Sequence, residues 1–152
     1  NKTLEKVIIQ DGVEIIDKQA FSECDNLTTV KMADSVTKIG NSAYYFCLKL
    51  SSINLSKKLS NLGIMAMHKT AIEEIEIPEG ITEIKENTFS RCEKLERVVL
   101  PKSVEKIANS AFSDCASLTN IEIDESNKNF KFKEEILMNA EENEMLIILP
   151  VL

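Results

Sequence analysis

Leu95–Ser117 reads LERVVLPKSVEKIANSAFSDCAS, and the rest of the chain repeats its pattern. Apolar residues stand at its first, fourth, sixth, tenth and thirteenth positions. A small residue and a large one follow, Ala111 and Phe112, and Cys115 stands three residues further on. The pattern begins again at Leu118. Self-similarity at a fixed period of about 20–50 residues indicates a stacked array of repeats.

The pattern recurs in steps of 23 residues, with one step of 22. The residues that begin each unit are Leu4, Leu27, Leu50, Ile72, Leu95 and Leu118. The third unit is the short one, and it has Thr70 in place of the cysteine and Met67 in place of the aromatic residue. We therefore expect a single domain, 1–152. Its parts are repeats at 4–26, 27–49, 50–71, 72–94 and 95–117, and a divergent terminal unit with a hairpin at 118–152.

The start of each repeat predicts a short strand with one buried face, because β-branched and aliphatic residues alternate with polar ones. The segment from the small residue to the cysteine predicts a turn of helix, since an offset of three places two side chains on one helix face. Gly12 and Gly80 stand at equivalent positions and predict bends with positive φ. In the terminal unit, residues 130–149 predict one hairpin with its turn at Ala140–Glu144.

The repeat resembles LxxIxLPxxVxxIgxxAFxxCxx, the unit of the BspA-like, or Treponema-type, leucine-rich repeats, and residues 4–117 match it five times. The resemblance implies a β-rich α/β fold. This fold is a right-handed solenoid with parallel strands on one side and short helical turns on the other. It also implies a cell-surface or secreted protein of adhesion and recognition rather than an enzyme.

The four cysteines occupy one repeat position, which the resemblance places inside the solenoid. Adjacent repeats lie within disulfide range, but their side chains would point the same way. Buried cysteine behaves as a small apolar residue. We therefore expect four free thiols and no disulfide.

Composition and charge limit the classes of partner and of location that the chain can have. The net charge of −7 argues against a nucleic-acid partner, because phosphate binding needs a basic surface. The apolar stretch at 145–152 is too short to span a bilayer, so we expect no membrane insertion. Asn1 stands within one register of Leu4 without an initiator Met, which predicts a piece of a longer protein.

Residues suited to catalysis or metal binding are few. His68 is the one histidine, and a nucleophile needs a neighbouring base. Glu74 and Glu76 stand two apart on a predicted strand without a third ligand nearby, which favours a solvated face over a metal site. We expect no enzyme, no cofactor and no metal.

Two surfaces are candidates for binding. The first, which we call the sheet face, consists of outward residues of the predicted strands: Lys6, Ile8, Lys31, Asn54, Glu74, Glu76, Arg97, Val99 and Glu122. The second, which we call the turn patch, consists of apolar residues where other repeats are polar: Tyr45, Phe46, Leu48, Ile64 and Met65. The turn patch is open to two interpretations, irregular local packing or a contact surface.

These features predict a non-catalytic protein-interaction module that binds a protein or cell-surface partner through the solenoid surface. The family resemblance points to host or extracellular-matrix proteins as partners and to a location at the cell surface or outside the cell. The alternative is a structural spacer or stalk without a ligand of its own.

Overall fold

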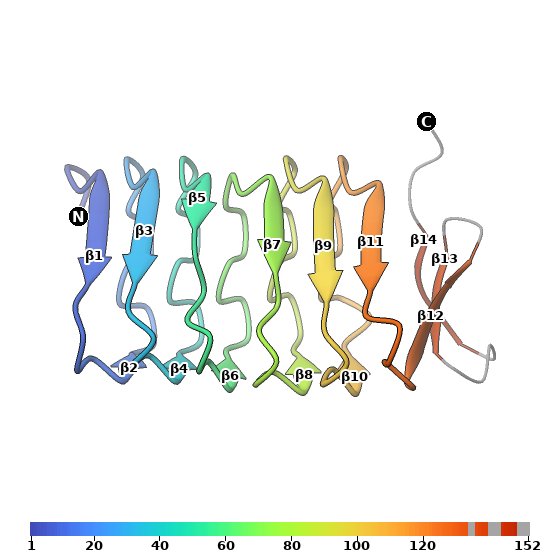
Figure 1. The fold of residues 1–152 in the computed structure, drawn as a ribbon. Coiled ribbons are helices and arrows are strands. Elements are labelled where there is room, and N and C mark those ends of the chain that lie inside the picture. The colour runs from blue at the N-terminus through green and yellow to red at the C-terminus, as the bar shows by residue number, and fades with distance from the viewer. Residues whose placement is uncertain (134–135, 140–143, 149–152) are drawn as a thin grey trace.

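The computed structural model describes residues 1–133, 136–139 and 144–148. The repeats lie side by side as turns of a solenoid, and the larger strands share one side (Figure 1). These main strands are parallel and form two sheets, in the orders β1-β3-β5 and β11-β9-β7. Their bounds are β1 (Lys6–Ile9), β3 (Thr29–Met32), β5 (Ser52–Ile53), β7 (Glu74–Glu76), β9 (Arg97–Leu100) and β11 (Asn120–Ile123).

The register of these sheets follows the repeat. Val7 pairs with Val30, and Val98 pairs with Ile121, so within each sheet the fourth position of one repeat lies beside the fourth position of the next. A second row of two-residue strands forms at the thirteenth position, again in parallel register. Its members are β2 (Ile15–Ile16), β4 (Lys38–Ile39), β6 (Asn61–Leu62), β8 (Glu83–Ile84) and β10 (Lys106–Ile107).

The expected helical turns are wrong: the described residues contain no helix, so the fold is an all-β solenoid rather than an α/β one. In the turn segments, backbone N–H groups alternately donate within the segment and to the next repeat. Phe21 N–H donates to Ala43 O over 2.8 Å, and Glu23 N–H donates to Tyr45 O over 2.7 Å. Residues with φ near +56°, such as Gln19 and Glu23, interrupt any helical path. A third ladder of bonds therefore runs along the turn side.

The apolar positions form one core along the solenoid. Leu27, Leu50 and Leu95 are fully buried at equivalent places in three repeats. Phe89 and Phe112 stack with ring centroids 5.3 Å apart and planes 7° apart. Because each row touches the same row of its neighbour, the repeats bury surface that none could bury alone.

All four cysteines are buried and free in this structure. The Cys47 thiol donates to Phe21 O over 3.0 Å, and the Cys115 thiol donates to Phe89 O over 3.1 Å. Burial, the main cause, raises the pKa of each of these two thiols to about 12. The cysteine therefore tethers its turn to the preceding repeat as a neutral donor.

The two glycines expected at bends, Gly12 and Gly80, differ in backbone conformation. Gly12 has φ of +90°, as predicted, but Gly80 does not lie in the positive-φ region. At Gly80 a Cβ atom would come within 2.3 Å of Leu59 O, closer than real contacts allow. Glycine at position 80 therefore permits a close approach of two backbones rather than an unusual φ.

The terminal unit contains three antiparallel strands, β12 (Phe130–Lys133), β13 (Ile136–Asn139) and β14 (Met145–Ile148). The prediction of one hairpin missed the pairing of β12 with β13, because FKFKEEILMN reads as one run. Most of the predicted turn, residues 140–143, lies outside the described residues. Phe130 and Leu137 are buried against the core, so this unit covers the end of the apolar column.

Candidate interaction surface

The sheet face is the outward side of the main strands. The strand alternation places Ile75 in the core and leaves Glu74 and Glu76 exposed, as the pattern predicts. Ile8 is 66% exposed, whereas Arg97 and Val99 are partly buried. All nine predicted residues lie on this side, at Lys6, Ile8, Lys31, Asn54, Glu74, Glu76, Arg97, Val99 and Glu122.

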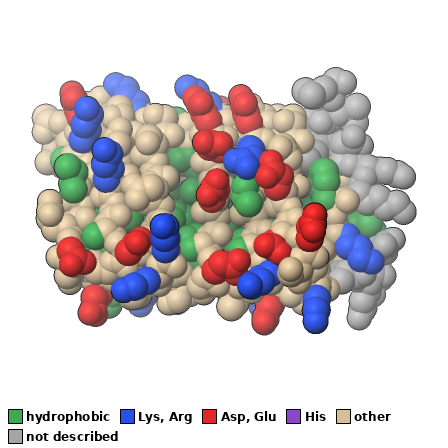
Figure 2. All heavy atoms as spheres, in the orientation of Figure 1, with side chains coloured by type: hydrophobic (Ala, Val, Ile, Leu, Met, Phe, Trp, Pro, Cys, Tyr) green, Lys and Arg blue, Asp and Glu red, His purple; other side chains and the backbone are tan. Residues whose placement is uncertain are grey.

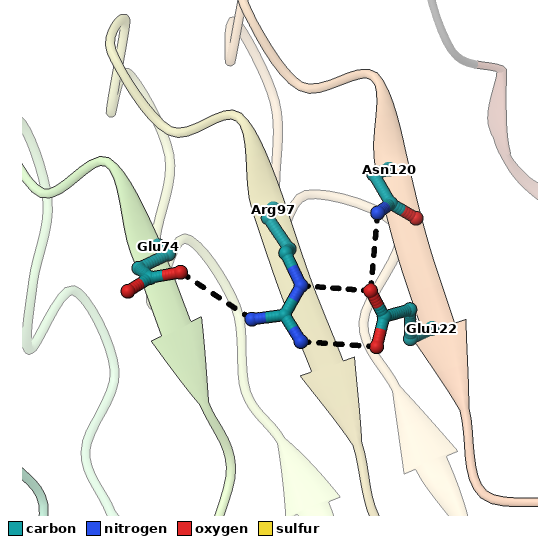
Figure 3. A network of polar contacts seen from close by, with 4 residues as sticks. All are labelled: Glu74, Arg97, Asn120 and Glu122. Carbon is teal, nitrogen blue, oxygen red and sulfur yellow. Dashed lines mark hydrogen bonds and ion pairs between the residues drawn. The ribbon is translucent and has the colours of Figure 1, made fainter.

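Arg97 is the centre of a polar network on this face (Figure 3). Its Nε donates to Glu122 Oε1 over 2.7 Å, and its Nη2 donates to Glu122 Oε2 over 3.0 Å. On the other side, Nη1 donates to Glu74 Oε2 over 3.3 Å. Asn120 Nδ2 also donates to Glu122 Oε1, over 3.1 Å. The network joins three successive strands, β7, β9 and β11.

The register explains how the network assembles. Glu74 and Arg97 are direct partners across β7 and β9, and Glu122 lies diagonally on β11. The two-pronged contact lowers the pKa of the Glu122 carboxyl, chiefly through its hydrogen bonds from Arg97. The same contact raises the pKa of the Arg97 guanidinium. Two-pronged contacts fix side-chain geometry, so this part of the face is ordered before any partner binds.

Charge is divided along the sheet face. Lys6 and Lys31 lie on β1 and β3, whereas Glu74, Glu76 and Glu122 lie on β7 and β11. Figure 2 shows basic side chains over the first strands and a cluster of acidic ones over β7 to β11. The face therefore presents two regions of opposite sign to a partner.

Both strand rows are interrupted between the third and fourth repeats, at a place that we call the break. No sheet joins β5 to β7 or β6 to β8 among the described residues, although all the other consecutive solenoid strands pair. The turn side is continuous here, since Met67 N–H donates to Thr88 O and Lys69 N–H donates to Ser90 O, each over 2.9 Å. Backbone hydrogen bonds in the described part of the chain thus join the third and fourth repeats on the turn side but not on the sheet face.

A groove of about 790 Å³ begins at the break and extends along the sheet face. Its floor includes Ile53 and Leu55 from the third repeat and the buried Ile77 from the fourth. Its acidic lining residues are Glu74, Glu76, Glu79, Glu122 and Asp124. Lys57 is the one basic residue in the lining among the described residues.

The turn patch is assembled only in part. Tyr45 and Phe46 have ring centroids 4.5 Å apart, and Tyr45 stacks on the His68 ring at 5.0 Å. Lys69 Nζ lies 5.0 Å from the Phe46 ring centroid. His68 and Lys69 were absent from the predicted patch, although a spacing of 23 residues from Tyr45 and Phe46 could have revealed them.

The exposure of the patch is mixed. Leu48 is 48% exposed and Ile64 is 37% exposed, whereas Met65 is partly buried. The His68 ring bonds to Ser90 Oγ over 2.6 Å. Partial burial and the charges of Arg91 and Lys69 lower the pKa of His68. His68 therefore packs within the turn side, where it contacts a serine and two aromatic rings.

Among the described residues, no group of three or more His, Cys, Asp or Glu side chains could hold a metal ion. The same residues include no helix with the length and apolar character needed to cross a membrane. The sheet face thus combines three features: the ordered charges of the Arg97 network, the apolar floor of the groove and the unpaired strand edges at the break.

Comparisons with known proteins agree with this architecture. The family model of the BspA type leucine rich repeat region matches residues 1–69 and 60–142, with six copies. This chain belongs to the BspA-type leucine-rich repeat family. Repeats of this family are generally non-catalytic and occur in bacterial cell-surface proteins.

Three solved structures illustrate the relationship to other BspA-type proteins. A leucine-rich cell surface protein of Faecalibacterium prausnitzii is 41% identical over 80% of this chain and 33% of its own, with a TM-score of 0.75. A leucine-rich repeat protein of Eubacterium ventriosum is 28% identical over 89% of this chain and 36% of its own, with a TM-score of 0.80.

The third is a leucine-rich repeat protein of Treponema pallidum, 35% identical over 78% of this chain and 58% of its own, with a TM-score of 0.74. The BspA-type chain described here thus matches between one third and about three-fifths of these proteins. No curated protein matches it.

Proposed function

We propose that this chain is a non-catalytic protein-interaction module of a cell-surface or secreted protein, and that it binds a protein partner through the sheet face. The observation that carries this proposal is the Arg97 network, in which Glu74 and Glu122 hold a guanidinium in place on an exposed sheet. Ordered side chains lose less conformational freedom on binding than mobile ones.

The kind of partner follows from the shape and charge of the face. The outward residues are mixed in sign, which suits an extended polar protein surface. Complementary charges guide such partners into register. The family's presence among bacterial cell-surface proteins supports host or extracellular-matrix proteins as the partner class.

Binding to a panel of immobilised extracellular-matrix proteins tests the proposal. We expect saturable binding to at least one of them, reduced at least tenfold by Lys31→Glu or Arg97→Glu. Lys102→Glu is the matched control, because Lys102 is exposed but outside the proposed face. Binding that is unchanged by both sheet-face substitutions would exclude this face. Absence of binding throughout would favour the alternative, a spacer or stalk.

The turn patch is a second candidate surface, because Leu48 and Ile64 leave apolar area exposed beside the aromatic rings. The double variant Tyr45→Ser with Phe46→Glu separates its two interpretations. A large loss of thermal stability would show that these rings are packing residues. Unchanged stability with lost association would show that they form a contact surface.

A further inference from the structure

The break has a simple origin in the sequence. In complete repeats, the N–H of the first aliphatic residue donates to the carbonyl of the cysteine three residues before it, as in Leu27 to Cys24 and Leu95 to Cys92, each over 3.0 Å. The third repeat has one residue fewer between Thr70 and Ile72. There, Ala71 N–H donates to Leu50 O over 3.0 Å, and the ladder goes no further.

The break leaves two strand edges open. At equivalent places, Ser52 N–H donates to Thr28 O over 3.1 Å and Arg97 N–H donates to Glu73 O over 3.3 Å. The corresponding bond from Glu74 N–H to Ser51 O does not form among the described residues. Unpaired strand edges are templates on which another extended chain can add.

The strand β7 beside the groove alternates between side chains that face the core and side chains that face solvent. On β7, Ile75 points into the core while Glu74 and Glu76 point outward. A strand added at this place would alternate in the same way, because successive side chains point to opposite faces of a sheet. In Figure 2, apolar side chains are visible between the two halves of the sheet, with acidic side chains close by.

The carboxylates on the outer side of the groove favour the binding of positively charged side chains. Within the described residues, Glu76 and Glu79 have no ion pair, whereas Glu74 and Glu122 already share Arg97. Glu76 and Glu79 therefore remain available to positive side chains, whereas Oδ1 of the groove residue Asp124 already accepts a hydrogen bond from Ser126 N–H over 2.8 Å. Opposite charges on neighbouring strands stabilise their pairing.

We propose that the break binds an extended segment of a partner protein in which Lys or Arg alternates with aliphatic residues. The segment adds to the open edges of β5 and β7, with its aliphatic side chains toward the groove floor and its cations toward Glu76 and Glu79. This inference rests on the proposed function, because the groove is part of the sheet face.

The direct test uses an acetylated and amidated octapeptide of alternating Val and Lys, whose binding to this chain is measured by fluorescence anisotropy. We expect saturable binding, weakened at least tenfold when every second backbone nitrogen of the peptide is methylated. We expect a similar loss with Glu76→Lys plus Glu79→Lys. The control is Glu93→Lys plus Glu105→Lys, which changes the net charge equally outside the groove and should leave the affinity within twofold.

A second experiment restores the pairing of β5 with β7 at the break. Insertion of one serine between Ala71 and Ile72 restores the 23-residue step and keeps every groove carboxylate. We expect this variant to pair β5 with β7 and to lose peptide binding at least tenfold. Equal binding by the repaired, folded variant would show attraction by charge alone and would overturn the inference. If the insertion prevents folding, the comparison of the peptide with its backbone-methylated form tests the inference instead.

Amide hydrogen exchange locates the site. In the free protein, the amides of Ile53, Glu74 and Glu76 should exchange faster than the paired amides of Val30, Arg97 and Val99, and peptide should slow them selectively. Slow exchange of all three in the free protein would overturn the inference. Matrix-protein binding that responds to Lys31→Glu while the peptide fails to bind would refute this inference and leave the proposed function intact.

Discussion

At the scale of the residue, each repeat position accepts a narrow range of side chains because it is stacked on its own copies. Phe21 and Tyr44 have ring centroids 5.4 Å apart and planes 8° apart, the same geometry as the pair in the fourth and fifth repeats. A change at one position therefore alters two interfaces. Deviations from the consensus residue are the places where single substitutions are most informative.

Tyr44 is such a deviation. It is fully buried, and its hydroxyl has no hydrogen-bond partner among the described residues. A buried, unpaired polar group costs about 1–3 kcal/mol. We therefore expect Tyr44→Phe to raise the free energy of unfolding by about 1 kcal/mol in urea denaturation. A decrease would contradict the assignment of this hydroxyl as unpaired.

The buried thiols predict a dependence of stability on pH. In the folded state the pKa of Cys47 and of Cys115 is about 12, whereas an unfolded thiol ionises near 8.5. The folded state therefore holds its thiol protons more tightly. Their contribution to stability is complete below about pH 8.5 and is lost as the pH rises toward 12.

The third repeat supplies the control for this effect, since it has Thr70 at the cysteine position. Urea denaturation from pH 8 to pH 11 should show a steeper loss of stability in the native chain than in Cys47→Thr plus Cys115→Thr. Parallel pH profiles would indicate that the thiols do not contribute.

At the scale of the element, the turn segment is a third ladder rather than a helix. Paired left-handed residues recur four apart, as at Gln19 and Glu23 and again at Asn87 and Arg91. This backbone directs alternate N–H groups toward the next repeat. The left-handed conformation costs an ordinary residue about 1–2 kcal/mol, which the inter-repeat bonds and packing offset.

Glu23 offers a clean test of that cost, because it is exposed and has φ of +56°. We expect Glu23→Gly to leave the midpoint of thermal unfolding unchanged or raise it, since glycine adopts positive φ without a steric penalty. Glu23→Val should lower the free energy of unfolding by about 1–2 kcal/mol, because a β-branched side chain crowds that backbone. Equal effects of the two substitutions would argue against the left-handed turn.

At the scale of the whole molecule, the stability of a solenoid is close to a sum of repeat and neighbour terms. The break removes two of three backbone ladders between the third and fourth repeats, while the turn side and the core remain continuous. We therefore expect weaker coupling across this interface than across the others. The same feature provides the open strand edges on the sheet face.

Hydrogen exchange measures this coupling. Leu27→Ala removes a fully buried side chain and should destabilise its repeat by about 2–5 kcal/mol. We expect amide protection to fall in repeats one to three much more than in repeats four and five. Leu95→Ala, in the fifth repeat, should give the reverse distribution. A uniform loss of protection in either variant would show that the break does not weaken coupling.

The sequence alone determined the solenoid, its register and the outward residues of the sheet face. Positions such as Val98 and Ile121 recur at a fixed interval, and a fixed interval aligns one repeat with the next. The periodicity also placed Arg97 and Glu122 on neighbouring strands. These conclusions depend on side-chain pattern, which the sequence states directly.

Only the tertiary structure decided the turns and the break. A spacing of three between Phe112 and Cys115 suits a helix, and it suits equally a turn whose N–H groups reach another repeat. The missing residue before Ile72 was visible, but its effect was not, because Ala71 N–H takes its partner, Leu50 O, from the start of its own repeat. Backbone hydrogen bonds depend on which chain segments meet in space, and that information is absent from a pattern of side chains.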